Sequence, residues 1–325
     1  MREGVPLQYT RVVLFCCTVL LSAACHSAAQ VPARAQTSGV VPGVEVWLQT
    51  DPGDLAGKRL GLITNHTGRT RAGVSTIDVL FNDKRVKLTA LFAPEHGIRG
   101  TDNAGLNISD SIDAKTKLPI YSLYSTEGNY RPTAIQMRQI DAMVFDIQDV
   151  GTRFYTYVWN MIMAMEFAAE MRRTFVVFDR PDPIGGELVQ GPLRERRDIV
   201  GLYPVTVRYG MTVGELARWV NSEFKIGADL RVIPMQGWRR SMNYADTKMP
   251  WIAPSPNMPS YESALHYPGT CLFEGTNLSV GRGTPFNSSV TGTFVNPTGI
   301  SRCVILTLPN TLEFALWMQP PFSSQ

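Results

Sequence analysis

The chain has few of the residues that would build a metal site or a disulfide scaffold. It contains five cysteines and four histidines in 325 residues, and Cys16, Cys17 and Cys25 all lie near the N-terminus. The other two, Cys271 and Cys303, could form one disulfide in an oxidising compartment. No cluster of Cys and His residues has the spacing of a zinc site. The sequence therefore predicts neither a disulfide-rich scaffold nor a bound metal.

The chain also lacks concentrated basic segments and nucleotide-binding motifs. The formal net charge is only +3, and no run of five or more Lys and Arg residues occurs. Because nucleic-acid binding needs a concentrated positive surface, we predict no nucleic-acid partner. There is no GxxxxGK[ST] motif, and Gly281 and Gly283 lack the strand and helix of a dinucleotide fingerprint. We therefore predict no cofactor.

The apolar segment at the N-terminus is too short to cross a membrane. Arg11 is followed by a mainly apolar run at 12–21 and then by small residues, the pattern of a secretory signal peptide. A membrane-spanning helix needs about 20 such residues. We predict a signal peptide over 1–29 and an exported protein, periplasmic or extracellular. Because the residues before Cys25 resemble a lipoprotein box, a lipid tether at Cys25 is an alternative to free release.

After a linker at 30–42, short apolar strands alternate with helices. Strands are expected at 59–64, 86–92, 118–123, 142–147, 174–179 and 230–234, and helices after Ser75 and at 133–139, 152–171 and 212–224. Strands that are apolar throughout indicate a mostly parallel sheet with helices on both faces. We predict an α/β domain over 43–235 and a smaller, loop-rich α+β domain over 236–325.

Polar residues follow four of the predicted strands. They are Asn65 and His66, Glu95 and His96, Asp146 with Gln148 and Asp149, and Asp179 with Arg180. Ligands of open α/β sheets bind beyond the carboxyl ends of the strands, so these residues predict one shared crevice. The alternative is that they are helix caps and turn formers, roles that Asn and Asp favour. That alternative is weakest for Glu95, which follows a proline and caps helices poorly.

Further polar residues lie on loops near the C-terminus. Residues 251–259 hold three prolines around Asn257, and the following segment brings Glu274, Asn277 and Arg282 among small residues. Amide, guanidinium and aromatic side chains on stiff loops are suited to binding sugars and carboxylates. Proline-rich turns without a binding role are the alternative.

A metal site made of His66, Glu95, His96 and Asp146 is a further alternative. No HExxH motif or comparable spacing supports it. We therefore predict no metal ligands.

Taken together, these segments resemble the exo-β-N-acetylmuramidases, the NamZ-type family also known as DUF1343 and glycoside hydrolase family 171. The resemblance runs from about Gly43 to about Phe286 and rests on motifs that occur in order. They are APEHG at 93–97, FDIQDVG at 145–151 with RFYTY at 153–157, DRPDP at 179–183, PSPNMP at 254–259, and LFEGTN at 272–277 with GRGT at 281–284.

The resemblance implies a Rossmann-like α/β domain followed by a smaller domain, with the active site in the cleft between them. The implied activity is release of N-acetylmuramic acid from the non-reducing ends of peptidoglycan fragments, in cell-wall turnover or recycling. The implied partners are peptidoglycan-derived muramyl glycans. The C-terminal residues 287–325 do not follow the family pattern, so we expect the smaller domain to be truncated or divergent after about 286.

Glycoside hydrolysis usually needs an acid and a second group near the anomeric carbon. We predict Glu95 as the general acid, with a pKa raised by the crevice and with His96 positioning it. The second group is Asp146 or Asp149, with Glu274 as a further choice, unless the 2-acetamido group of the sugar is itself the nucleophile. The predicted substrate-binding residues are Asn65, His66, Gln148, Arg153, Tyr157, Asn257, Glu274, Asn277 and Arg282.

A guanidinium binds a carboxylate bidentately, so Arg153 or Arg282 could pair with the lactyl carboxylate of the muramyl residue. Two other functions remain open at this point. The protein could be a non-catalytic lipoprotein that binds cell-wall sugars, or a metal-dependent hydrolase that uses His66, Glu95 and His96.

Overall fold

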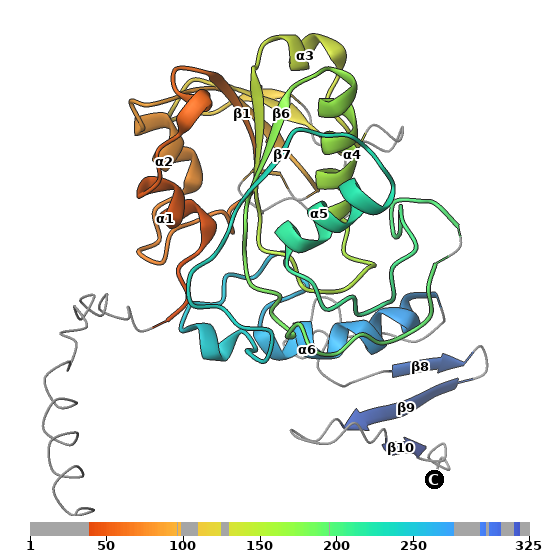
Figure 1. Cartoon of the computed structure of the whole chain (residues 1–325). Helices are drawn as coiled ribbons and strands as arrows, with labels where there is room; N and C mark the ends of the chain where they lie inside the picture. Colours follow the sequence, from red (N-terminus) through yellow and green to blue (C-terminus); the bar gives the residue numbers. More distant parts are fainter. Residues whose placement is uncertain are drawn as a thin grey trace, which may run out of the picture. The chain divides into compact units, whose positions relative to one another are not determined.

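Figure 1 shows the fold in a computed structural model of the chain. The structure describes residues 39–95, 97–98, 110–124, 130–194 and 196–275, together with the backbone of three short strands nearer the C-terminus. His96, Asn277 and Arg282 lie outside the described residues, as do the side chain of Cys303 and the predicted signal peptide. The predictions that rest on them stay predictions.

A seven-stranded sheet forms the centre of the described chain, in the order β3-β4-β2-β1-β5-β6-β7. Only β3 is antiparallel to its neighbour. The six parallel strands, counted along the chain, have the order 3-2-1-4-5-6, which is that of the Rossmann fold. The strands are β1 (Arg59–Thr64), β2 (Lys87–Ala93), β3 (Ser111–Ile112), β4 (Pro119–Ser122), β5 (Ala142–Asp146), β6 (Thr174–Phe178) and β7 (Leu230–Ile233). The predicted mostly parallel α/β fold is confirmed.

Helices cover both faces of this sheet. In Figure 1, α1 (Gly43–Leu48) and α2 (Thr76–Asn82) lie on one face, and α4 (Tyr157–Glu170) and α5 (Val213–Glu223) on the other. Alternate residues of a strand therefore enter different clusters: Leu62 packs on the α1 and α2 side and Ile63 on the α4 and α5 side. Because both faces are buried, the middle of each central strand is apolar, and polar residues occur mainly toward the strand ends.

One helix starts later than the sequence predicts, and another starts as predicted. The helix predicted from 152 begins at Tyr157 instead. Thr152 forms a bridge with Arg208, and the Arg153 amide donates to the Val207 carbonyl, so this segment is held in a turn by a distant part of the chain. A cap at Ser75 is confirmed, because its hydroxyl accepts from the Ile77 amide.

The residues after β7 contribute to the same core. They form short 3-10 helices, η2 (Ala245–Thr247) and η3 (Cys271–Gly275), and the helix α6 (Tyr261–Thr270). Met258 and Ala264 belong to the hydrophobic cluster under α4 and α5. Three more strands, β8 (Thr293–Asn296), β9 (Gly299–Leu306) and β10 (Ala315–Met318), pair antiparallel.

Two shorter elements complete the description, η1 (Gly53–Leu55) and α3 (Ala134–Arg138). Within the part of the chain that the structure describes, no helix is long and apolar enough to span a bilayer.

The cap of α5 also stabilises the end of β6. The Thr212 hydroxyl accepts from the Glu215 amide at 3.2 Å and donates to Asp179 Oδ2 at 3.0 Å. We expect Thr212→Ala to lower the free energy of unfolding by about 1–2 kcal/mol, because it removes a cap and leaves a buried carboxylate short of a donor. Denaturant unfolding measures this change.

The matched control is Ser222→Ala, which removes an exposed hydroxyl from the same helix. We expect it to change the free energy by less than about 0.5 kcal/mol. Equal effects of the two substitutions would contradict the assigned role of Thr212.

Candidate functional site

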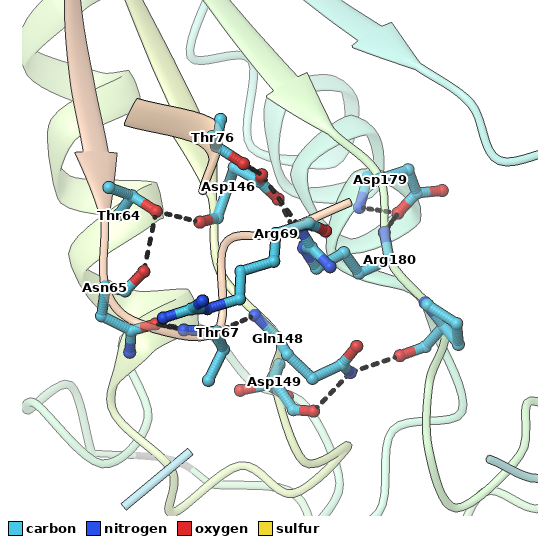
Figure 2. A network of polar contacts seen from close by, with 12 residues as sticks. Thr64, Asn65, Thr67, Arg69, Thr76, Asp146, Gln148, Asp149, Asp179 and Arg180 are labelled. Atoms are coloured by element: carbon cyan, nitrogen blue, oxygen red, sulfur yellow. Dashed lines mark hydrogen bonds and ion pairs between the residues drawn. The ribbon is translucent and has the colours of Figure 1, made fainter. Parts of the chain in front are cut away.

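The strand order reverses between β1 and β5, and a buried ion pair lies at this point (Figure 2). Asp146, the last residue of β5, receives the Arg180 guanidinium through two bonds, of 2.5 and 2.9 Å. The Thr76 hydroxyl at the start of α2 donates to the same carboxylate. Both charged side chains are almost fully buried, at 0% and 3% exposure. The carboxylate of Asp146 is thus paired inside the protein, and its predicted catalytic role stays a prediction.

Thr67 joins the loops that follow β1 and β5. Its hydroxyl donates to Asn65 Oδ1 at 2.6 Å and accepts from the Gln148 amide at 2.9 Å. The Gln148 side-chain amide in turn donates to the Asp149 and Pro181 carbonyls, both at 2.8 Å. Figure 2 shows this chain of contacts below the ion pair. The predicted residues at these strand ends therefore do come together.

Glu95 lies at the end of β2, on a turn closed by the Gly97 amide and the Pro94 carbonyl. It is half-buried, and the Thr156 hydroxyl donates to its Oε2 at 3.2 Å. The Tyr124 phenol is also close to Glu95. Burial, and then the charge of Glu95, raise the pKa of this phenol to about 12. Glu95 is therefore surrounded by hydroxyl groups.

The proline-rich loop packs directly on this region. His66 Nε2 lies 2.6 Å from the Ala253 carbonyl, and the Tyr157 hydroxyl donates to the Pro254 carbonyl at 2.8 Å. The same hydroxyl is 3.5 Å from the Glu95 carbonyl. Burial raises the pKa of Tyr157 well above its usual value, so the phenol stays protonated and can donate. The loop that carries the half-buried Asn257 thus adjoins Glu95.

Asp149 is buried beside this region. The Tyr209 hydroxyl and the Gly151 amide both donate to its Oδ2. Gly151 has a φ of +76°, and a Cβ there would lie 2.2 Å from Asp182 Oδ1, so the turn requires glycine. Burial raises the pKa of Asp149 to about 6, although both hydrogen bonds act in the opposite direction.

Asp179 is the fourth strand-end carboxylate, and it binds the start of α5. The Gly214 amide donates to its Oδ1 at 2.9 Å. Burial raises the pKa of Asp179 to about 6. For Asp179 the structure matches the alternative reading of strand-end carboxylates as helix caps and turn formers.

The remaining predicted residues lie elsewhere. Arg153 is buried, and its Nη1 donates to the Pro192 and Val205 carbonyls at 2.8 and 2.7 Å. Burial and the neighbouring Arg194 lower its pKa. Glu274 is exposed in η3. Among the described residues, no three His, Cys, Asp or Glu side chains are grouped so that they could hold a metal ion.

Sequence reasoning missed Thr76, Thr156 and Tyr209. Each is a hydroxyl that donates to one of the predicted carboxylates from a distant segment. Thr156 could have been predicted from the sequence, because it belongs to the same RFYTY motif as Tyr157. The other two had no signal in the sequence.

The strand order and the polar groups at its switch point define an α/β protein of Rossmann topology. The N-terminal profile of the exo-β-N-acetylmuramidase NamZ matches residues 60–262, and the C-terminal profile matches residues 265–302. The chain belongs to the NamZ exo-β-N-acetylmuramidase family. The predicted family is confirmed, whereas the domain boundary at 235 stays a prediction.

Individual relatives agree with this assignment. The chain is 42% identical over 327 aligned residues to the peptidoglycan β-N-acetylmuramidase NamZ of Bacillus subtilis (strain 168), covering 99% of this chain and 78% of the relative. Two crystal structures of DUF1343 family proteins from Bacteroides fragilis are similar. One has a TM-score of 0.73 at 37% identity, covering 80% of this chain and 67% of that one. The other has a TM-score of 0.69 at 36% identity, covering 81% and 69%.

The raised pKa of Asp149 predicts a pH-dependent stability. Between about pH 4 and 6 the unfolded chain releases this proton while the folded protein keeps it, so the contribution of Asp149 to stability falls as pH rises. Asp149→Asn removes this titration. We expect the free energy of unfolding of the variant, minus that of the wild type, to increase by up to about 3 kcal/mol as the pH rises from 4 to 7.

Urea unfolding of both proteins at each pH measures this difference. A difference that does not change with pH would contradict a raised pKa at Asp149.

Proposed function

We propose that this chain is an exported, exo-acting glycosidase that releases N-acetylmuramic acid from the non-reducing ends of peptidoglycan fragments. Membership of the NamZ family and 42% identity to the Bacillus subtilis enzyme support the activity. The signal-peptide pattern over 1–29 supports export to the periplasm or beyond, with a lipid tether at Cys25 as the alternative. Peptidoglycan-derived muramyl glycans are the proposed partner.

The observation that carries the mechanism is the surroundings of Glu95. This carboxyl group follows the carboxyl end of a central strand and accepts a bond from Thr156, and the backbone carbonyl of Glu95 lies 3.5 Å from the Tyr157 hydroxyl. Its turn is fixed by Pro94 and by a backbone hydrogen bond. A general acid must be held within reach of the leaving oxygen, and a rigid turn beside a polar loop does this. We assign Glu95 as the acid.

The surroundings of the two aspartates favour a second group supplied by the substrate. Asp146 is fully buried against Arg180, and Asp149 is buried against Tyr209. A carboxylate nucleophile must reach the anomeric carbon, which neither is placed to do. The 2-acetamido group of the sugar then serves as the nucleophile. Asn65 and Tyr157, predicted as substrate-binding residues, adjoin each other but are as deeply buried as the two aspartates, so we assign them no contact with this group.

Replacing the acid tests the role of Glu95. Glu95→Gln keeps an acceptor for Thr156 but has no proton to give. We expect kcat on a β-linked muramyl disaccharide to fall about 10²- to 10⁴-fold. The loss should be much smaller on 4-nitrophenyl β-N-acetylmuramide, because nitrophenolate leaves without protonation.

The matched control is Glu223→Gln, at the exposed end of α5, which we expect to leave both rates unchanged. An equal loss on the two substrates would assign Glu95 to positioning rather than to acid catalysis.

The proposed acetamido nucleophile makes a separate prediction. Stepwise fluorination of the N-acetyl group weakens its carbonyl oxygen as a nucleophile, so kcat/KM of the wild type should fall steeply from N-acetyl to N-trifluoroacetyl muramides. Steady-state rates on this substrate series measure the slope. If kcat/KM does not change along the series, the nucleophile is a group of the enzyme. Glu274 would then be the first residue to substitute.

A further inference from the structure

A small pocket lined by both polar and apolar side chains lies beside the carboxyl ends of β1 and β5. Arg69 and Thr67 from the loop after β1 line it, together with Gln148, Arg180 and Ile252. It therefore combines residues of the strand-end network with the loop that packs on that network. The function proposed above uses none of these contacts.

The pocket carries one positive charge that no described carboxylate balances. Arg71, which also lines it, pairs with Glu45 at 2.8 Å, and Arg180 pairs with Asp146. Arg69 instead donates to carbonyl groups, at 2.7 Å to His66 and at 3.1 Å to Gly73. Within the described residues no carboxylate lies within ion-pair distance of Arg69. The pocket is thus suited to an anionic group.

The pocket also contains an acceptor that needs a donor. Two carbonyl partners fix the Gln148 Nε2, so the position of its Oε1 is fixed too. This oxygen is buried and has no hydrogen-bond partner among the described residues. In Figure 2 it points away from the two carbonyls, toward Arg180. Leaving such an acceptor unpaired is costly, which favours a ligand that brings a donor.

We propose that Arg69 and Gln148 form the subsite that recognises the non-reducing muramyl terminus. Arg69 binds the lactyl carboxylate carried on O3, and Gln148 Oε1 accepts from the adjacent free O4 hydroxyl. This inference rests on the proposed function. It gives a reason for exo action, because an internal residue has its O4 substituted and offers no donor. It also gives a reason for sugar choice, because N-acetylglucosamine has no lactyl carboxylate.

The pocket and Glu95 lie on either side of one loop. Ile252 lines the pocket, whereas the next two residues contact His66 and Tyr157 through their carbonyls. Tyr157 in turn adjoins Glu95. A single sugar ring over this loop would place O3 and O4 in the pocket and the glycosidic oxygen at the acid.

The test compares 4-nitrophenyl β-N-acetylmuramide with its lactyl methyl ester. We expect the wild type to favour the acid by about ten- to hundredfold in kcat/KM, mainly through KM. Arg69→Gln should lose this preference, so that kcat/KM on the acid falls much further than kcat/KM on the ester. A 4-deoxy muramide should lose at least about tenfold on the wild type, because Gln148 then has no donor.

The matched control is Arg218→Gln, an exposed arginine on α5, which should keep the full preference. Equal losses of kcat/KM on acid and ester in Arg69→Gln would overturn the subsite. Equal kcat/KM values of the wild type on the acid, the ester and the 4-deoxy substrate would overturn it as well. The wild-type comparisons stand even if Arg69→Gln does not fold.

A separate measurement distinguishes failure of the subsite from failure of the proposed function. If the wild type cleaves none of these substrates, the proposed activity is wrong. Equilibrium binding of N-acetylmuramic acid and of its methyl ester then tests the subsite without catalysis. Tighter binding of the acid that disappears in Arg69→Gln supports the subsite. Equal binding of acid and ester overturns it.

Discussion

The buried ion pair between Asp146 and Arg180 is the contact on which the rest of the site depends. It joins the ends of β5 and β6, takes a bond from Thr76 at the start of α2, and lets Arg180 reach the Arg69 carbonyl at 2.9 Å. A charge taken out of water is tolerated only when it is paired and fully hydrogen-bonded. Each partner is therefore required by the other, and four segments of the chain are fixed at one point.

This requirement divides the strand-end carboxylates into two groups. Asp146, Asp149 and Asp179 face inward and hold a strand end, a glycine turn and a helix start in place. Glu95 alone of the four is only half-buried, on a turn next to the proline-rich loop. In the proposed mechanism the buried aspartates hold the strand ends in place, and Glu95 and the substrate supply the reacting groups. In the proposed subsite, the charge of Arg69, which no described carboxylate balances, selects the sugar that binds.

The sequence predicted most of the fold because the central strands are buried on both faces and read as apolar runs. It misplaced the start of α4 because Thr152 and Arg153 pair with residues 207–208, a contact that no local pattern encodes. The gathering of strand-end residues followed from the topology of parallel sheets. Which carboxylates have structural roles did not, since Arg180 and Tyr209 reach Asp146 and Asp149 only through the packing of neighbouring strands and loops. The catalytic roles themselves stay predictions.

The central claim is that one muramyl residue lies over the proline-rich loop, with its glycosidic oxygen at Glu95 and its lactyl carboxylate at Arg69. A crystal structure of the Glu95→Gln variant with a β-linked muramyl disaccharide measures this directly. The account predicts hydrogen-bond distances from the substituted side-chain amide to the glycosidic oxygen and from the Arg69 guanidinium to the carboxylate. A sugar bound with its anomeric carbon beside Asp146 or Asp149, or with its carboxylate away from Arg69, would contradict it.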